Sequence, residues 1–421
     1  MIQAWVDGER VGLLDRRPPR GATFGYDPST IAARSVSLTM PVRVQSWDAK
    51  FGLLPIFEMN LPEGALRERL TRRFAKATGT FDDFDLLGVV GRSQIGRIRY
   101  SALDRDLTED VPFQSIDEIL RARRDGDLFT YLLDRFAEHS GLSGVQPKVM
   151  IRANDDKLSP TAGCTSSSIS NATHIVKMWD ANEFPELAAN EFYCLQVAKR
   201  LGLEVPEFSL SDDGGALIVE RFDCVGEKYL GLEDFCVLNG LGAADKYKGG
   251  YETRIFKRLR DFSTAPELAK SLEKLFQLFV LNCAIRNGDA HLKNFALTYQ
   301  SPEGAVRLAP VYDLVTTPAY LPNDPMALTL NGSTRWPSRD ALIRLAQTRC
   351  DLSVPRAVSF LESTADAMSE VVPDVQRYFG QQTGEVGSRI LAGILAAWAV
   401  GINDSLGLVR GFTPGASLTN T

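Results

Sequence analysis

The feature that most constrains the fold of this 421-residue chain is a long apolar helix followed at once by polar side chains. Residues 266–288 read PELAKSLEKLFQLFVLNCAIRNG, and their apolar positions recur at helical spacing. Asp289 and Asn294 follow, five residues apart, and Asp313 comes nineteen residues later in PVYDLV. Two interpretations stay open at this point: solvated residues beyond a helix end, or oxygen ligands that a buried helix holds in place.

The second interpretation matches a known chemical arrangement. The D-x-x-x-x-N spacing is that of the protein-kinase catalytic loop, in which the Asp lies next to the attacking hydroxyl. The Asn and a later Asp hold Mg²⁺ against the phosphates of ATP, and hard oxygen ligands suit this ion. Asp289, Asn294 and Asp313 are candidates for these three roles.

A lysine in a predicted strand and a glutamate in the predicted helix after it form a second candidate pair. The segment THIVKMW, residues 173–179, alternates like a strand and has Lys177 near its centre. The helix predicted over 185–202 carries Glu191, fourteen residues after the lysine. Protein kinases hold the α- and β-phosphates with such a lysine and orient it with such a glutamate. The alternative is a lysine that reaches solvent from a sheet edge.

A turn rich in small residues, SGLSGVQPK, precedes this predicted sheet at residues 140–148. Small residues let backbone N–H groups approach phosphate oxygens and form an anion nest, to which Lys148 adds positive charge. The segment has neither the GxGxxG nor the Walker A pattern, so a plain loop is the alternative.

The order of these signals predicts the fold class. Loop, strand, lysine strand, glutamate helix, two strands and a helical region that contains D-x-x-x-x-N form the order of a two-lobed kinase. We therefore expect an α+β, bilobal, protein-kinase-like fold with a small antiparallel-sheet lobe over 106–224 and a mostly helical C-lobe over 225–421. VERFD, residues 219–223, falls where the hinge should contact adenine, and residues 1–105 form an N-terminal α+β accessory domain.

Composition excludes several other classes. The 47 basic and 53 acidic residues give a net charge of −6, which argues against DNA binding by this chain alone. The six cysteines lack CxxC spacing and there are three histidines, so a zinc site is not expected, and the usage favours a reducing cytosol. No signal peptide is visible, and the apolar run over 390–402 is too short to span a bilayer and is predicted to be a core helix.

Several of these segments together resemble the HipA-type serine/threonine kinase toxins of bacterial toxin–antitoxin pairs. The resemblance covers nearly the whole chain, including the small N-terminal domain, and rests on SGVQPK, THIVK, NEFYCLQVAKRLGL, VERFD, LEDFC…LG…KY, NGDAHLKNF and PVYDL. It implies that Asp289 is the catalytic base, that Asn294 and Asp313 bind Mg²⁺ and that Lys177 binds phosphates. The further ATP contacts that it implies are Ser143, Gly144, Val145, Gln146, Pro147 and Lys148 in the loop, Glu220, Arg221 and Phe222 at the hinge, and His291, Leu292, Lys293, Asn294 and Tyr312, with Asp313 beside them. The pairing of Glu191 with Lys177 comes from the general kinase analogy.

The resemblance also implies autophosphorylation of a serine in the Gly-rich loop. The position three residues before the glycine of GVQ, which usually carries this serine, is Gly141 here. Ser143 occupies a second position used by some family members, and Ser140 is one residue away from the usual one. We predict Ser143 as the modified residue, because a phosphate there would repel the phosphates of ATP.

As a member of this family, the chain is expected to phosphorylate a translation component such as an aminoacyl-tRNA synthetase in the cytoplasm, slowing growth and favouring persistence. A small helix-turn-helix antitoxin of the HipB type would neutralise it and make the DNA contacts, and no membrane is involved. Two kinds of alternative stay open. One is a small-molecule kinase of the aminoglycoside-phosphotransferase type, and the other is a nucleotide-binding pseudokinase or co-repressor.

Overall fold

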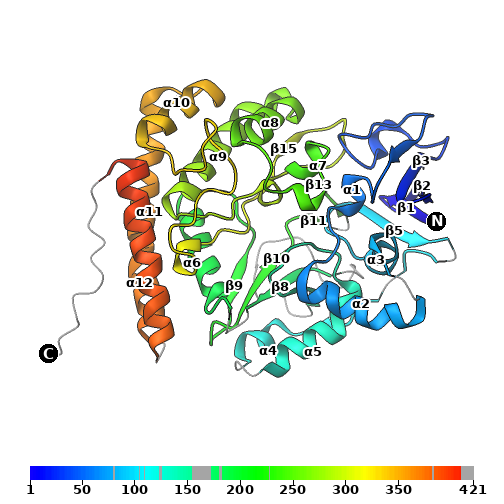
Figure 1. The fold of residues 1–421 in the computed structure, drawn as a ribbon, viewed down its shortest axis with the longest axis horizontal. Coiled ribbons are helices and arrows are strands. Elements are labelled where there is room, and N and C mark those ends of the chain that lie inside the picture. Colours follow the sequence, from blue (N-terminus) through cyan, green and yellow to red (C-terminus); the bar gives the residue numbers. More distant parts are fainter. Residues whose placement is uncertain are drawn as a thin grey trace.

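The computed structural model describes residues 1–78, 81–103, 105–108, 110–122, 126–153, 172–179, 183–226, 228–381 and 384–408. Figure 1 shows antiparallel sheets from the N-terminal half beside a helical region that ends in two long helices. The chain therefore has the mixed α+β architecture that the sequence predicts. The two lobes and the N-terminal domain all contribute residues to the wall of a cavity of about 870 Å³.

The N-terminal residues form a five-stranded antiparallel sheet in the order β4-β3-β2-β1-β5. Asp7 and Gly8 form the turn of its first hairpin with positive φ angles of 53° and 78°, the backbone that an Asp-Gly hairpin turn adopts. The strands are β1 Ile2–Val6, β2 Glu9–Arg17, β3 Gly21–Tyr26, β4 Trp47–Ala49 and β5 Ile98–Ala102. The helices beside them are α1 Pro55–Glu58, α2 Gly64–Thr78 and α3 Asp83–Val90.

A second sheet has the order β6-β7-β8-β10-β9 and is antiparallel except between its first two strands. Its inner strand β10 alternates, so that Leu217 and Val219 face one hydrophobic core while Ala216 and Ile218 face another. The strands are β6 Phe113–Gln114, β7 Lys148–Ala153, β8 His174–Met178, β9 Phe208–Leu210 and β10 Ala216–Glu220. The helices are α4 Ile116–Arg121, α5 Gly126–Phe136 and α6 Leu187–Arg200.

The C-terminal half is mostly helical, with two small antiparallel sheets, β11-β12 and β13-β14-β15. The strands are β11 Cys224–Val225, β12 Lys228–Tyr229, β13 Gly231–Asp234, β14 Ala296–Tyr299 and β15 Val306–Leu308. The helices are α7 Phe235–Leu238, α8 Lys257–Phe262, α9 Ala265–Ala284, α10 Arg339–Arg349, α11 Val354–Gln381 and α12 Glu385–Val400. The apolar helix α9 ends at Ala284, earlier than its sequence pattern indicates, because Arg286 takes a left-handed backbone with φ 57°.

Two hydrophobic cores meet at the second sheet. One core joins the N-terminal sheet and its helices to β7, β8 and one face of β10. The other joins α6 and the second face of β10 to α9, α11 and α12. The N-terminal domain therefore shares a continuous core with the smaller lobe and is not connected to it by a linker alone, while the predicted boundaries near 105 and 224 stay predictions.

The helical stretch Glu385–Leu406 is long and apolar enough, by length and composition, to cross a membrane, although 44% of that window is buried inside the protein. Trp398 and Ile394 on this stretch are almost fully buried in the larger core. These buried side chains pack as in a core helix, as the sequence predicts, but the helical stretch extends beyond residues 390–402, so the expectation that it is too short to span a bilayer is wrong.

Candidate active site

A single cavity of about 870 Å³ collects the residues that the sequence analysis singles out. Of the seventeen residues predicted to act in catalysis or to contact ATP or Mg²⁺, sixteen line this cavity and one, Leu292, does not. Glu191, the predicted partner of Lys177, lines it as well. The Leu292 side chain is fully buried in the larger hydrophobic core, so it cannot contact a ligand in the cavity. This volume lies near the upper end of the range for small-molecule sites.

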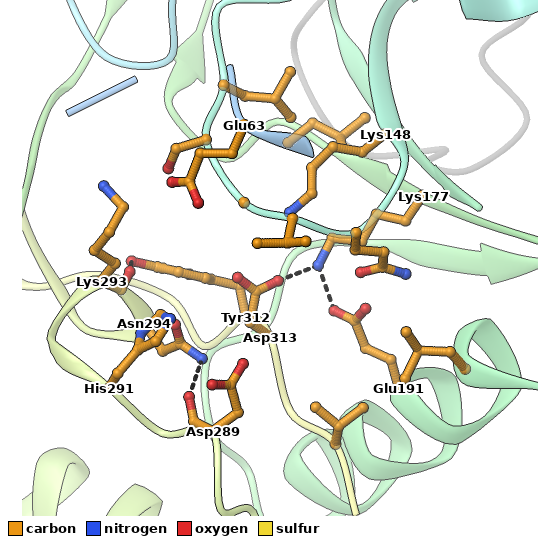
Figure 2. A pocket seen from close by; sticks show the side chains of 18 of the residues that line it. Glu63, Lys148, Lys177, Glu191, Asp289, His291, Lys293, Asn294, Tyr312 and Asp313 are labelled. Carbon is orange, nitrogen blue, oxygen red and sulfur yellow. Dashed lines mark hydrogen bonds and ion pairs between the residues drawn. The ribbon is translucent and has the colours of Figure 1, made fainter. Parts of the chain in front are cut away.

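Lys177, Glu191 and Asp313 form a charged group deep in this cavity (Figure 2). Lys177 projects from β8, and its Nζ lies 2.5 Å from Glu191 Oε1 on α6. The same Nζ forms an ion pair with Asp313, which follows β15. We call Lys148, Lys177, Glu191 and Asp313 the lysine cluster. The structure thus brings together the lysine and the glutamate that the sequence places fourteen residues apart.

Charge attraction overcomes burial at the centre of the lysine cluster. Burial opposes the charged form of Lys177, but the carboxylates of Asp313 and Glu191 outweigh it and raise its pKa. Burial likewise disfavours ionised Asp313, but Lys177 and Lys148 keep the pKa of Asp313 below its usual range. Burial prevails at Glu191 and raises its pKa. Lys177 and Asp313 are therefore an ionised pair at neutral pH, held in a low-dielectric setting.

Lys148 brings a second positive charge to the cluster from the first residue of β7. Burial lowers its pKa, against the opposing attraction of Asp313. The loop before it bends at Gly144, whose φ of 114° favours glycine. A Cβ at Gly144 would also lie 2.4 Å from Lys148 Nζ, so a side chain at this position would displace the lysine. The small residues of this loop thus let its backbone approach the charged end of Lys148.

The backbone at Asp313 is unusual. Asp313 has φ 55°, a left-handed conformation that Asp tolerates better than most residues but that still costs about 1–3 kcal/mol. Its carbonyl accepts a hydrogen bond from Asn287 Nδ2 at 3.4 Å, which ties it to the end of α9. This conformation keeps the carboxylate in the cavity, where one third of the side chain is exposed.

The segment after α9 turns Asp289 and Asn294 toward the cavity (Figure 2). Asn294 Nδ2 donates to the backbone carbonyl of Asp289 at 3.0 Å, and the Asp289 N–H donates to Asn287 Oδ1 at 3.2 Å. Because the amide nitrogen of Asn294 is used in this way, its oxygen is the atom that can bind a ligand. Burial raises the pKa of Asp289, although a hydrogen bond from Tyr247 opposes this shift.

Tyr247 and His291 cover one side of Asp289. Tyr247 Oη donates to Asp289 Oδ1 at 2.6 Å, and its ring packs edge-on against His291 with centroids 5.0 Å apart. Burial lowers the pKa of His291 to about 3, and the nearby Lys246 lowers it further. His291 is thus a neutral packing residue beside the cavity. We call Tyr247, Asp289, His291 and Asn294 the tyrosine cluster.

The N-terminal domain forms part of the cavity wall through residues 58–64. Lys293 Nζ donates to the carbonyl of Met59 and to Asp234 Oδ2, both at 2.8 Å. Asp234 outweighs the effect of burial and raises the pKa of Lys293. Glu63 Oε2 lies 3.7 Å from Lys246 Nζ, so two lysines of the larger lobe contact this segment.

Helix α2 begins against the Gly-rich loop. A Cβ at Gly64, its first residue, would lie 2.7 Å from the carbonyl oxygen of Val145. Gly64 also has φ 52°, a backbone that glycine adopts readily. The N-terminal domain therefore touches the same loop that carries Ser143, across about eighty residues of sequence.

The predicted hinge lies at the cavity but uses Arg221 for internal contacts. The Arg221 guanidinium forms an ion pair with Asp223 at 2.7 Å and donates to the backbone carbonyl of Gln94. The Arg221 backbone N–H donates to the backbone carbonyl of Thr173. The Phe222 ring instead lies nearly parallel to that of Tyr312, with centroids 6.1 Å apart. Tyr312 is anchored by its hydroxyl, which donates to the Lys293 carbonyl at 3.0 Å. Of the hinge residues, Phe222 thus offers the cavity an aromatic face.

The two candidate serines of the Gly-rich loop have different surroundings. Ser140 is fully buried; its hydroxyl donates to the Phe136 carbonyl at 2.7 Å and accepts from the Met150 N–H at 2.8 Å. Ser143 is half-buried and lines the cavity. A phosphate on Ser140 would break two internal hydrogen bonds, whereas Ser143 faces the cavity.

Sequence reasoning missed the residues on the outer side of the tyrosine cluster. Lys246 and Tyr247 belong to the LG…KY segment, which contributed only to the family resemblance, and Glu63 carries no pattern of its own. Among the described residues there is no group of three His, Cys, Asp or Glu side chains arranged to hold a metal ion by themselves. The Asp313 carboxylate and the Asn294 amide are nevertheless the oxygen donors that suit a hydrated Mg²⁺, which takes few protein ligands.

The fold and the cavity define a two-lobed, kinase-like protein with an additional N-terminal α+β domain. A family model described as the HipA-like C-terminal domain matches residues 140–373, more than half of the chain, and one described as the HipA N-terminal domain matches residues 2–101. The chain therefore belongs to the HipA-like family.

Known relatives and a solved structure are similar to three quarters or more of the chain. The candidate kinases Y4mE and Y4dM of Sinorhizobium fredii are 27% identical over 401 residues and 28% identical over 335 residues. These alignments cover 89% and 75% of this chain, and 92% and 76% of the relatives. The structure of HipA of Shewanella oneidensis, solved with HipB and operator DNA, superposes on this chain with a TM-score of 0.67 at 19% sequence identity. The superposition covers 97% of this chain and 98% of the HipA chain. This last similarity shows the fold.

Proposed function

We propose that the chain is an ATP- and Mg²⁺-dependent protein serine/threonine kinase and the toxin of a bacterial toxin–antitoxin pair. The observation that carries the proposal is that the ionised pair of Lys177 and Asp313 shares one cavity with Asp289 and Asn294. Phosphoryl transfer needs these parts, because its catalysis is mostly positioning and charge stabilisation. The candidate kinases among its relatives support the same activity.

The residues divide the work between them. Lys177 and Lys148 would bind the phosphates of ATP, while Glu191 keeps Lys177 in place. Asp313 and the amide oxygen of Asn294 would hold Mg²⁺, which when bound neutralises charge on the phosphates. Asp289 accepts the proton of the attacking hydroxyl, and its raised pKa makes it a better base than an exposed carboxylate. Phe222 and Tyr312 would flank the adenine.

Autophosphorylation at Ser143 is part of the proposal. Ser143 lines the cavity beside Lys148, whereas the Ser140 hydroxyl is engaged in the protein interior. A phosphate on Ser143 would carry nearly two negative charges into the place where the ATP phosphates bind. Repulsion would then expel the nucleotide or the loop, and the modified enzyme would be inactive.

The family membership supports the biological part of the proposal. We propose a cytoplasmic protein that phosphorylates a translation component such as an aminoacyl-tRNA synthetase, slows growth and favours persistence. A helix-turn-helix partner of the HipB type would neutralise it, as the solved HipA is a complex with HipB and operator DNA. The net charge of −6 leaves the DNA contacts to that partner.

Mass spectrometry of the purified chain after incubation with ATP and Mg²⁺ tests the chemistry. We expect phosphate on Ser143 in the unsubstituted protein and none in Asp289→Asn, with ATP affinity measured by calorimetry in both. Formation of ADP without phosphorylated protein would favour a small-molecule kinase. Binding of ATP without any turnover would favour a pseudokinase and contradict the proposal.

A further inference from the structure

The hydroxyl of Tyr247 lies where an acceptor hydroxyl is needed. Its Oη donates a hydrogen bond of 2.6 Å to Oδ1 of Asp289, the carboxylate that is the base in the proposed function. A general base must lie about 2.6–3.2 Å from the oxygen whose proton it removes. The phenol therefore makes the same contact that the hydroxyl of a reacting serine or threonine would make.

The backbone that carries Tyr247 is held at several points. The Lys246 carbonyl accepts from the Leu292 N–H at 3.1 Å, and the Ala243 N–H donates to Glu58 Oε1 at 3.0 Å. The side chain of Lys246 adds the contact of 3.7 Å to Glu63. Two of these contacts come from the N-terminal domain. The turn over 243–248 is thus fixed to the catalytic segment and to residues 58–64, and it cannot easily move as a whole.

The side chain of Tyr247 is free to move where its backbone is not. It is 51% exposed, so rotation into solvent uncovers little buried apolar surface. Three contacts hold it in the observed position: the edge-on contact with His291, the hydrogen bond to Asp289, and Lys246 Nζ over its ring at 5.5 Å from the centroid. Rotation of this single side chain would open Asp289 to a second reactant without changing the lysine cluster.

We propose that Tyr247 is a gate on the acceptor site: its phenol holds the place of the acceptor hydroxyl on Asp289, and a protein alcohol must displace it before transfer. This inference rests on the proposed function. In the open state, the acceptor O–H gives its proton to Asp289, its oxygen bonds to the γ-phosphorus, and the bond from that phosphorus to the ADP oxygen breaks. While the gate is closed, water is kept from the same position, and the enzyme does not hydrolyse ATP wastefully.

The test compares ATP hydrolysis, with water as the acceptor, in the intact chain and in Tyr247→Phe. The variant keeps the ring against His291 but cannot donate to Asp289. We expect steady-state ADP release, counted beyond one ADP per chain to exclude autophosphorylation, to rise about three- to tenfold, the effect of one hydrogen bond. The KM for ATP should stay unchanged, because the lysine cluster is intact. Tyr247→Leu should also release ADP faster than the unsubstituted chain.

Tyr378→Phe is the matched control, since Tyr378 also donates to a carboxylate, Glu186 Oε2 at 3.0 Å, outside the cavity. It should hydrolyse ATP at the unsubstituted rate, and adding Asp289→Asn to Tyr247→Phe should abolish the increase. Hydrolysis that is unchanged or slower in Tyr247→Phe, with activity present in the unsubstituted chain, would overturn the gate alone. Absence of ADP from every protein despite ATP binding would overturn the proposed function together with the gate.

Discussion

The two sides of the cavity are built in different ways. The lysine cluster lies on elements of the two kinase-like lobes and is held by direct ion pairs among its members. The tyrosine cluster lies on one segment and one turn of the larger lobe, and residues 58–64 of the N-terminal domain brace that turn and the neighbouring Lys293. The central members of one side thus pair directly with one another, whereas the turn on the other side is also braced by side chains of the N-terminal domain.

Burial separates the Lys177–Glu191 pair from Tyr247, although His291 and Asn294 beside Tyr247 are also buried. Lys177 is 5% exposed and Glu191 is 3% exposed, whereas Tyr247 is 51% exposed. Charges in a dry setting attract strongly and hold one geometry, while a half-exposed side chain exchanges its contacts at small cost. The lysine cluster, the proposed phosphate side, is thus rigid, whereas the proposed acceptor side around Tyr247 is adjustable.

The largest effect should come from Lys177→Met. It removes the cation that separates Glu191 and Asp313, so we expect a loss of about 3–5 kcal/mol in the free energy of unfolding, as for other broken buried ion pairs. Phosphoryl transfer should fall by about 10²–10³-fold or more. Urea unfolding and a transfer assay measure the two effects.

Lys199→Met is the control for this change. Lys199 lies on α6, the same helix as Glu191, but pairs with Glu207 at the surface with half of its side chain exposed. Its loss should cost less than about 1 kcal/mol. Equal unfolding free energies for the two variants would show that the lysine cluster is not the rigid side.

The next effect concerns the brace of the acceptor side. In Lys293→Met, the buried Asp234 loses its cation and the Met59 carbonyl loses its donor. We expect a loss of about 3 kcal/mol in unfolding free energy. Hydrogen exchange of residues 58–64 should also become faster, because this contact joins the N-terminal domain to the catalytic segment. Lys257→Met, which removes an exposed pair within α8, should change neither quantity. Unchanged exchange in Lys293→Met would mean that the N-terminal domain is held by other contacts.

The two sides of the cavity also differ in how much of each the sequence could predict. The sequence could predict one shared site for five residues that the structure brings to one cavity, because each lies on a local element whose pattern and order are visible in the chain: Lys177, Glu191, Asp289, Asn294 and Asp313. The α+β class and the helical C-terminal half follow from periodicity in the same way. Side chains that act through local elements can be found from spacing alone.

Contacts between distant segments leave no such pattern. Glu63 and Met59 reach Lys246 and Lys293 across more than 180 residues, and residues 1–105 showed no evident chemistry in the sequence. Leu292 lies in the same segment as Lys293, yet it points into the core, because it occupies the inner side of a single 3₁₀ turn over Leu292–Asn294 whose other two residues line the cavity. The family resemblance implies a nucleotide contact for Leu292, and only the packing of the folded chain shows that its side chain is buried away from the cavity.

A smaller effect should separate the two serines at the Gly-rich loop. Ser140→Ala leaves the buried Met150 N–H without its acceptor, so we expect a loss of about 1–3 kcal/mol in unfolding free energy. Ser143→Ala should change stability by less than about 0.5 kcal/mol but remove the phosphate that ATP leaves on the chain. Phosphate that persists in Ser143→Ala would assign the modification to another residue and weaken the link between loop and cavity.

The smallest effect is a pH dependence at the tyrosine cluster. Burial lowers the pKa of His291 to about 3, so the folded protein keeps this imidazole neutral, while the unfolded chain binds a proton near pH 6.5. Because the unfolded chain binds more protons between these values, stability falls as the pH drops through this range.

We expect His291 to account for a loss of about 1 kcal/mol in unfolding free energy between pH 7.5 and pH 5.5. His291→Gln cannot take up this proton, and other groups titrate equally in both proteins, so the difference between their urea unfolding curves isolates the histidine. Curves that fall in parallel would show that His291 gains a proton in the folded state. Solvent would then reach the ring beneath Tyr247, and the acceptor side would be open even when its phenol contacts Asp289.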